Sequence, residues 1–134
     1  MRNGKRPLRR GFTFVELMVV ITIVVILVAM AIPQLTKSIT QSKEGVLRNN
    51  LFTLRTSIQH YSYDKGKAPP GLQDLVTDGY LRVIPTDPMN NYSTDWKVEM
   101  EEAPQSSTQS DPGVWNVHSS SSKTGLNGTP YSEW

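Results

Sequence analysis

One long apolar segment limits what this chain can fold into more than any other feature. Residues 12–32 form a run of 21 residues in which Glu16 is the only charged side chain. As an α-helix that rises about 1.5 Å per residue, the run would reach about 31 Å, close to the hydrocarbon thickness of a bilayer. The segment therefore predicts a helix that crosses a membrane once.

The first ten residues of the chain carry basic charge and no acid. Their basic side chains are Arg2, Lys5, Arg6, Arg9 and Arg10. Positive flanks of membrane helices stay in the cytoplasm, so the rest of the chain should lie on the opposite side. A secretory signal peptide is the competing interpretation. However, the run is longer than the apolar region of such a peptide, and residues 31–34 contain no small-x-small cleavage pattern.

Beyond the apolar run the chain is polar and slightly acidic. Five of its 14 Lys and Arg residues stand among the first ten positions, so the remaining nine are outnumbered by 12 Asp and Glu residues. This balance does not suggest a nucleic-acid partner. Cysteine is absent from the sequence, which excludes a disulfide framework and a cysteine metal site.

Glu16 is an unusual residue for the start of a membrane helix. A charged side chain at the centre of a spanning helix costs roughly 2.5–3.5 kcal/mol, and less toward the end, where Glu16 lies. A cut between Gly11 and Phe12 would give Phe12 a new ammonium group. That group would supply a counter-charge for the carboxylate, whereas an acid that merely snorkels to the headgroups would need none.

The motif of Gly11, Phe12 and Glu16, between a short basic leader and a spanning run, resembles the class III signal of type IV pilins and of type II secretion pseudopilins. The resemblance implies that a prepilin peptidase cuts after Gly11 and N-methylates Phe12. It also implies that Glu16 of one subunit pairs with the Phe12 ammonium of a neighbour in a filament, which would fix the axial register. An ordinary anchor with an incidental acid is the alternative.

The helix is predicted to continue beyond the membrane, over residues 12–63, with a bend at Pro33. Proline lacks an N–H group and collides with the preceding turn. In the family that the motif resembles, a proline here lets the helix loosen during assembly. After it, an apolar stripe recurs at helical spacing, at Leu47, Leu51, Leu54, Ile58 and Tyr61, and should pack on the rest of the body.

Polar residues of the same helix, among them Glu44, Arg48 and Arg55, are expected on its other faces. Residues 64–66 predict the end of the helix, and residues 72–79 a short helix or turn.

Two antiparallel strands, residues 96–100 and 114–118, are predicted to pack on this helix. Strict alternation places Trp96, Val98 and Met100 on one face of the first strand. In the second strand it places Val114, Asn116 and His118 opposite Trp115 and Val117. The predicted fold is thus α+β: a long N-terminal helix with a transmembrane half and an amphipathic half, packed on a small antiparallel sheet, as in type IV pilins.

No cofactor and no metal are expected. Many major pseudopilins hold calcium in the last loop with aspartates, but residues 118–130 of this chain contain no Asp or Glu, and calcium prefers carboxylate ligands. Tyr131 and Trp134 are expected to anchor that loop instead. An enzyme is not expected either. Residue types that enzymes use for acid–base or nucleophilic chemistry are present, but no catalytic motif organises them: Asp64, Asp74, Asp78, Asp87, His60, His118 and many serines.

The sequence thus predicts three segments: a cleaved basic leader at 1–11, a transmembrane and filament-core helix at 12–33, and a periplasmic α+β domain at 34–134. The resemblance implies a structural subunit of a type II secretion pseudopilus in the bacterial inner membrane. Its expected partners are copies of itself, prepilin peptidase, minor pseudopilins and an inner-membrane assembly platform with an ATPase. A type IV pilus subunit for adhesion, motility or DNA uptake is the alternative.

Overall fold

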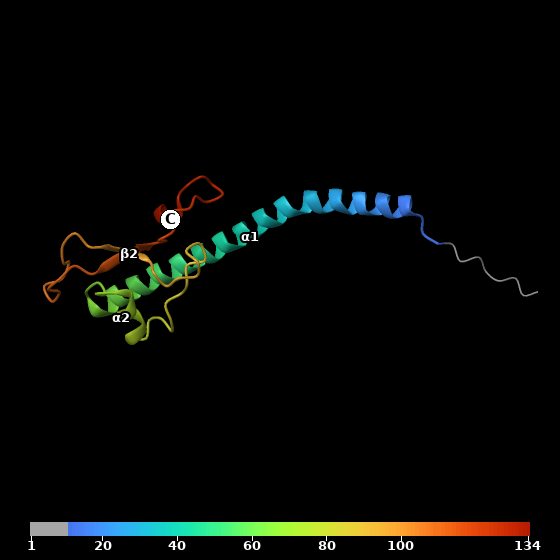
Figure 1. Cartoon of the computed structure of the whole chain (residues 1–134). Coiled ribbons are helices and arrows are strands. Elements are labelled where there is room, and N and C mark those ends of the chain that lie inside the picture. The colour runs from blue at the N-terminus through green and yellow to red at the C-terminus, as the bar shows by residue number, and fades with distance from the viewer. Residues whose placement is uncertain (1–10) are drawn as a thin grey trace, which may run out of the picture. The chain divides into compact units, whose positions relative to one another are not determined.

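The computed structural model describes residues 11–134, so the predicted leader lies, apart from Gly11, outside the described residues. The elements follow in the order α1 (Phe14–Lys65), α2 (Leu72–Thr77), β1 (Lys97–Met100), β2 (Val114–His118) and the 3-10 helix η1 (Tyr131–Glu133) (Figure 1). The chain divides into two compact units, the first ending at Ser38 and the second running from Ile39 to Trp134. The long helix and the small antiparallel sheet confirm the predicted α+β fold.

The predicted long helix is present as α1, with each end two residues later than expected. It continues through Pro33, although proline removes the N–H group that would bond the carbonyl four residues earlier. The bend at this residue stays a prediction. The helix stops at Lys65 because Gly66 adopts φ +67°, a left-handed conformation that glycine reaches without a side-chain clash.

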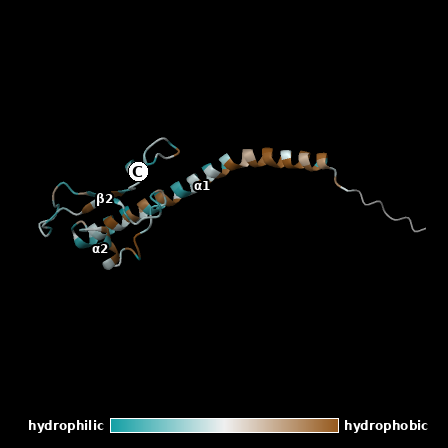
Figure 2. Ribbon diagram, viewed as in Figure 1, coloured by the Kyte–Doolittle hydropathy of each residue, from teal (hydrophilic) through white to brown (hydrophobic). Residues whose placement is uncertain are grey.

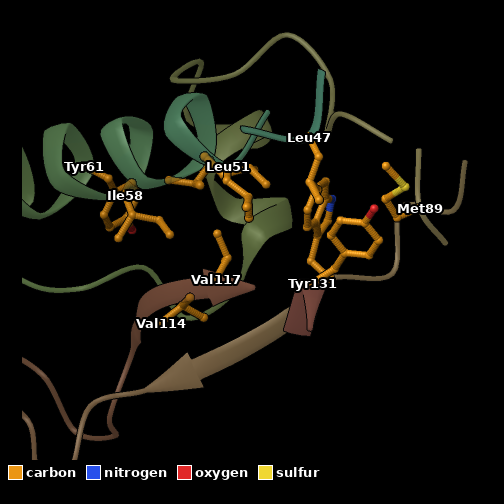
Figure 3. Close-up of a cluster of buried hydrophobic side chains, with 11 residues drawn as sticks. Leu47, Leu51, Ile58, Tyr61, Met89, Val114, Val117 and Tyr131 are labelled. Atoms are coloured by element: carbon orange, nitrogen blue, oxygen red, sulfur yellow. The ribbon is translucent and has the colours of Figure 1, made fainter. Parts of the chain in front are cut away.

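The core of the second unit forms where the apolar stripe of α1 meets the shorter elements. Every member of the predicted stripe is buried: Leu47, Leu51, Leu54, Ile58 and Tyr61. Figure 3 shows side chains of this stripe pointing toward Val114 and Val117 of β2. Burying a side chain of this size is worth roughly 1.5–3 kcal/mol before entropy is subtracted, so the stripe is the main attachment of the sheet to the helix.

β1 and β2 pair in the predicted antiparallel direction. Lys97 lies opposite His118, and Met100 lies opposite Val114. The register shifts between Glu99 and Met100, so the pairing is irregular at that point. Such an irregularity bends a strand and changes the direction of its side chains.

The predicted faces of β2 are wrong. Val114 and Val117 are both buried, whereas strict alternation put them on opposite faces. Trp115, which alternation placed on the same face as Val117, is 58% exposed. The register shift explains the difference, because period-two alternation holds only where pairing is regular.

Two polar residues of α1 face inward, contrary to the prediction. Glu44 is 3% exposed. Arg55 is half-buried and donates to the Asn116 side-chain oxygen (2.9 Å) and to the Val117 carbonyl (2.8 Å). Both residues lie within one turn of stripe positions, so their side chains reach groups on the segments that pack there.

Asp87, one of the acids available for chemistry, has a structural role in a turn. It is fully buried and accepts hydrogen bonds from the Met89 N–H (2.8 Å) and the Ser119 hydroxyl. The turn that follows holds Asn91 at φ +50° and Tyr92 at φ +56°, which is uncommon for residues with side chains. The carboxylate of Asp87 thus fixes the start of this turn and ties it to the segment after β2.

Candidate functional site

Gly11 and Phe12 form an exposed, non-helical segment directly before α1. Phe12 is 80% exposed. Apart from Gly11 itself and its two chain neighbours, no described residue has an atom within 4 Å of the place that a Cβ at Gly11 would occupy. Proteases cut exposed backbone outside regular structure most readily. The bond between these two residues is therefore accessible to a peptidase.

Two reciprocal hydrogen bonds between Thr13 and Glu16 close the first turn of α1. The Glu16 N–H donates to the Thr13 hydroxyl (3.2 Å), and the Thr13 N–H donates to the Glu16 carboxylate (3.5 Å). This arrangement is a capping box, which satisfies N–H groups that the start of a helix leaves without partners. Sequence reasoning missed it, although Thr-x-x-Glu before an apolar run predicts the motif. Glu16 thus has a partner in its own chain.

Among the described residues, α1 is the one helix long and apolar enough to cross a membrane by length and composition. Its first part is coloured as strongly apolar in Figure 2. The side chains there are largely exposed, as in Leu17 (51%) and Leu27 (61%). An apolar surface of this extent marks contact with lipid or with another apolar surface.

Pro33 lies at the far end of this apolar surface, 17 residues after Glu16, or about 26 Å along the helix axis. The structure therefore does not bring it near Gly11, Phe12 or Glu16, which lie together at the start of the helix. Close to the proline, the Thr36 hydroxyl donates to the Ile32 carbonyl (3.1 Å). Such back-bonding weakens a helix slightly, and the proline removes one backbone bond, so α1 is locally weaker here.

In the second unit, Glu44 joins α1 to the last loop. Its carboxylate accepts hydrogen bonds from the Leu126 N–H (2.7 Å) and the Tyr131 hydroxyl (2.9 Å). Burial and the bond to Glu44 raise the pKa of Tyr131 to about 12. Trp134 adds a bond from its indole N–H to the Thr129 hydroxyl (2.8 Å). The loop is thus held by Tyr131 and Trp134, as expected, and by an acid whose role the sequence did not reveal.

A groove of about 800 Å³ between α1 and β2 contains His118 and Ser62, residue types that hydrolases use. The Ser62 hydroxyl donates to the Ile58 carbonyl (2.8 Å). The His118 ring lies 2.7 Å from the Trp134 carbonyl and 3.3 Å from Glu99, and its hydrogen bond lowers the pKa of Glu99. A nucleophile and its base must lie within hydrogen-bond reach, so the groove does not assemble a serine–histidine pair.

The other candidate acids are dispersed. Asp64 accepts a hydrogen bond from the Tyr80 hydroxyl (3.0 Å), and Asp78 pairs with Lys65 (3.3 Å). Within residues 11–134, no group of three or more His, Asp or Glu side chains is placed to hold a metal ion. The expectation that no metal is bound stays a prediction.

Comparison with known proteins identifies the family. Residues 6–32 match the model of the prokaryotic N-terminal methylation motif. Type II secretion system core protein G of Klebsiella michiganensis is 31% identical over 100 residues, which cover 63% of this chain and 70% of that protein. The protein of the same name from Pseudomonas aeruginosa is 31% identical over 103 residues, covering 65% and 72%. The chain belongs to the major pseudopilins.

A further relative of this pseudopilin is Competence protein ComGC of Halalkalibacterium halodurans, 32% identical over 79 residues that cover 58% of this chain and 78% of that protein. No solved structure matches the chain. The resemblance inferred from Gly11, Phe12 and Glu16 is thus confirmed for the family. The roles of these residues and of Pro33 stay predictions.

Proposed function

We propose that this pseudopilin is a structural subunit of a type II secretion pseudopilus, which polymerises through its N-terminal helix to drive export of folded proteins across the outer membrane. The observation that carries the proposal is the apolar start of α1, whose side chains are exposed in the isolated chain. A bilayer would cover this surface before assembly, and the helices of neighbouring subunits would cover it afterward. The relatives named as secretion core proteins support the same function.

In this proposal the chain has three parts. Residues 1–11 are a leader that prepilin peptidase removes by cutting after Gly11, and the same enzyme methylates the new amino group of Phe12. Residues 12–33 cross the inner membrane and later form the filament core. Residues 34–134 are the periplasmic domain, because the basic leader keeps the N-terminus in the cytoplasm.

Glu16 has two successive partners in this proposal. In the precursor its carboxylate caps α1 through the Thr13 N–H, at a long 3.5 Å. After cleavage, the Phe12 ammonium of a neighbouring subunit is the stronger partner, because it carries a full opposite charge, which attracts the carboxylate in an apolar core more strongly than the neutral Thr13 N–H does. In an apolar filament core, any register that left Glu16 unpaired would bury an uncompensated charge. Pro33 is the place where the helix loosens as the subunit moves into the filament.

The proposed partners are copies of the same chain, prepilin peptidase, minor pseudopilins and the inner-membrane platform with its ATPase. Calcium is not among them. We therefore expect a calcium chelator to leave the melting temperature of the second unit unchanged. A marked decrease on chelation would show that neutral oxygens of the last loop bind the ion.

Two substitutions of Glu16 test the function and separate its two partners. Glu16→Gln keeps a side-chain oxygen that can cap the helix, whereas Glu16→Ala keeps neither cap nor charge. We expect both variants to insert in the membrane and to lose residues 1–11, with one methyl group added in the intact mass. Both should form few filaments. Wild-type filament yield from Glu16→Gln would show that the cap, and not the charge pair, is what assembly requires.

A subunit of a surface or DNA-uptake filament is the second candidate, because a competence protein is among the relatives. Deletion of the gene separates the two functions. Loss of exoprotein release with normal twitching and transformation supports the secretion pseudopilus. The opposite pattern supports the pilus.

A further inference from the structure

Charge is distributed unevenly over the second unit. Residues 39–63 of α1 carry the basic side chains Lys43, Arg48 and Arg55, and their single acid, Glu44, is buried. Residues 98–122 show the reverse, with four acids and no Lys or Arg: Glu99, Glu101, Glu102 and Asp111. The unit therefore has one basic and one acidic segment.

The basic segment contributes residues to a groove on the surface of the domain. A groove of about 450 Å³ is lined by Arg48, Phe52, Arg55 and Trp134, among others. The Arg48 guanidinium lies 4.4 Å from the centre of the Trp134 ring and 3.9 Å from the Glu44 carboxylate, which orient it, and its side chain is still 59% exposed. Phe52 is 69% exposed. Exposed aromatic and arginine side chains around a groove are typical of the centre of a protein interface.

The acidic segment contains a loop, residues 101–113, that carries three of its four acids. Glu101 closes the base of loop 101–113, since its carboxylate accepts from the Gln109 side chain (2.8 Å) and the Gly113 N–H (3.2 Å). Glu102 and Asp111 are exposed, and neither carboxylate has a hydrogen-bond or ion-pair partner among the described residues. The fold of the loop thus leaves two carboxylates available to a partner.

The groove and the loop lie at different levels along α1. The base of the loop meets the chain just after the helix, where the Val114 N–H donates to the Pro69 carbonyl (2.8 Å). In Figure 1 the orange loop before β2 lies at the end of α1 nearest α2. Arg48 is 17 residues before the last helical residue, Lys65, which is about 26 Å along the axis. Within one subunit the loop shares the larger groove of about 800 Å³ with Arg55 and Trp134, through Glu101 and Gln105, whereas Arg48 and Phe52 do not line that groove.

We propose that loop 101–113 of one subunit docks on the groove around Arg48 and Phe52 of a second copy of this chain. Opposite charges favour this pair over like-charged contacts, which cost several kcal/mol. Because two different surfaces meet, the contact is heterologous, and heterologous contacts that do not close into a ring produce open filaments. The contact rests on the proposed function and adds a second subunit interface, outside the apolar core.

Charge reversal in the full-length chain tests the contact, with filaments sheared from cells as the measurement. Glu102→Lys should lower filament yield about tenfold, because it places like charges at the interface. It should leave subunit accumulation unchanged, since the side chain has no hydrogen-bond or ion-pair partner within residues 11–134. Asp95→Lys, an equal change of charge at an exposed acid outside the loop, is the control and should assemble normally.

Arg48→Glu alone should also lower yield, and Arg48→Glu combined with Glu102→Lys should restore part of it, because the loss of the ion pair between Arg48 and Glu44 is common to both variants. Phe52→Ala should also lower filament yield. Because the Phe52 ring is exposed, its removal should leave the fold intact, so unfolding would not explain a loss of yield. Filaments of Glu102→Lys and Phe52→Ala at wild-type yield would overturn the contact, as would a double variant no better than Arg48→Glu alone. Absence of filaments from the wild-type chain would overturn the proposed function itself, so the two failures are distinguishable.

Discussion

The two parts of α1 belong to one helix but depend on different partners. In the first unit, apolar side chains occupy all faces and are exposed, as in Leu17 and Leu27. In the second unit, apolar side chains follow one stripe, and Leu47 and Leu54 are completely buried. A helix that is apolar all round needs a membrane or other helices, whereas an amphipathic helix can be covered by its own domain.

This difference separates what folds a subunit from what assembles it. The buried stripe of the second unit obtains its partners from the same chain, at β2, α2 and η1. The first unit has to obtain its partners from lipid or from other subunits. Changes in the buried stripe should therefore alter the stability of the domain, and changes in the first unit should alter assembly.

The largest expected effect comes from shortening the chain at its N-terminus. A chain that starts at Gln34 keeps the whole stripe and should fold cooperatively as a soluble domain. A chain that starts at Arg55 lacks Leu47, Leu51 and Leu54, each worth roughly 1.5–3 kcal/mol of burial, and should aggregate or stay unfolded. Thermal melting by circular dichroism checks both. Similar cooperative melting of the shorter chain would show that the helix does not hold the domain together.

A matched pair of leucine truncations sharpens the comparison. Leu54→Ala should lower the free energy of unfolding of the second unit by roughly 2–5 kcal/mol, because it leaves a cavity in a closed core. Leu27→Ala removes the same atoms from an exposed position and should change that free energy by less than about 0.5 kcal/mol. Denaturant unfolding of the detergent-solubilised chains measures both. Equal effects would contradict the division into two units.

The sequence predicted those parts of the structure that local patterns determine. The stripe from Leu47 to Tyr61 was visible because it repeats at helical spacing, and Gly66 marked the helix end because few other residues adopt a positive φ there. The candidate segment with Gly11, Phe12 and Glu16 could be found for a similar reason, since its residues are close in sequence. Even so, the charge pattern around Glu16 did not by itself predict the capping box that this residue forms with Thr13.

Features that depend on distant partners could not be predicted in the same way. The inward direction of Glu44 depends on Leu126 and Tyr131, which lie more than 80 residues later in the chain. The exposure of Trp115 depends on the register shift opposite Glu99 and Met100, where Trp115 is the extra residue of β2, and the sequence pattern of β2 alone does not reveal it. The spacing of residues within a segment predicts which side chains share one face of a helix or strand. It does not predict where distant hydrogen-bond donors will need an acceptor.

Removal of Glu44 should have an intermediate effect, confined to the second unit. Glu44→Ala leaves the part-buried Leu126 N–H and the buried Tyr131 hydroxyl without their acceptor and should cost roughly 1–3 kcal/mol of stability. Glu44→Gln keeps one acceptor oxygen and should cost less. Hydrogen exchange of the Leu126 amide is the measurement, because opening of the loop should precede global unfolding. Unchanged exchange in Glu44→Ala would show that the loop is held by other contacts.

The smallest expected effect is a loss of stability at alkaline pH that depends on Tyr131. Burial and the bond to Glu44 raise the pKa of this hydroxyl from 10.0 to about 12 in the folded state. Between these values the unfolded chain gives up the tyrosine proton while the folded chain keeps it. Stability is therefore fully present below pH 10 and decreases as pH rises, by about 1 kcal/mol between pH 10 and pH 11.

Tyr131→Phe keeps the ring in the core and removes the titrating group, so this variant should be less stable than the wild type at neutral pH. Its stability should fall less steeply with pH above 10. Lys65 and Tyr80, whose pKa values are also raised, titrate in both chains and cancel in the comparison. Denaturant unfolding at pH 8, 10 and 11 measures the difference. Parallel plots of unfolding free energy against pH for the two chains would mean that the Tyr131 proton is not held by Glu44. A Leu27→Ala control should follow the wild type at each pH.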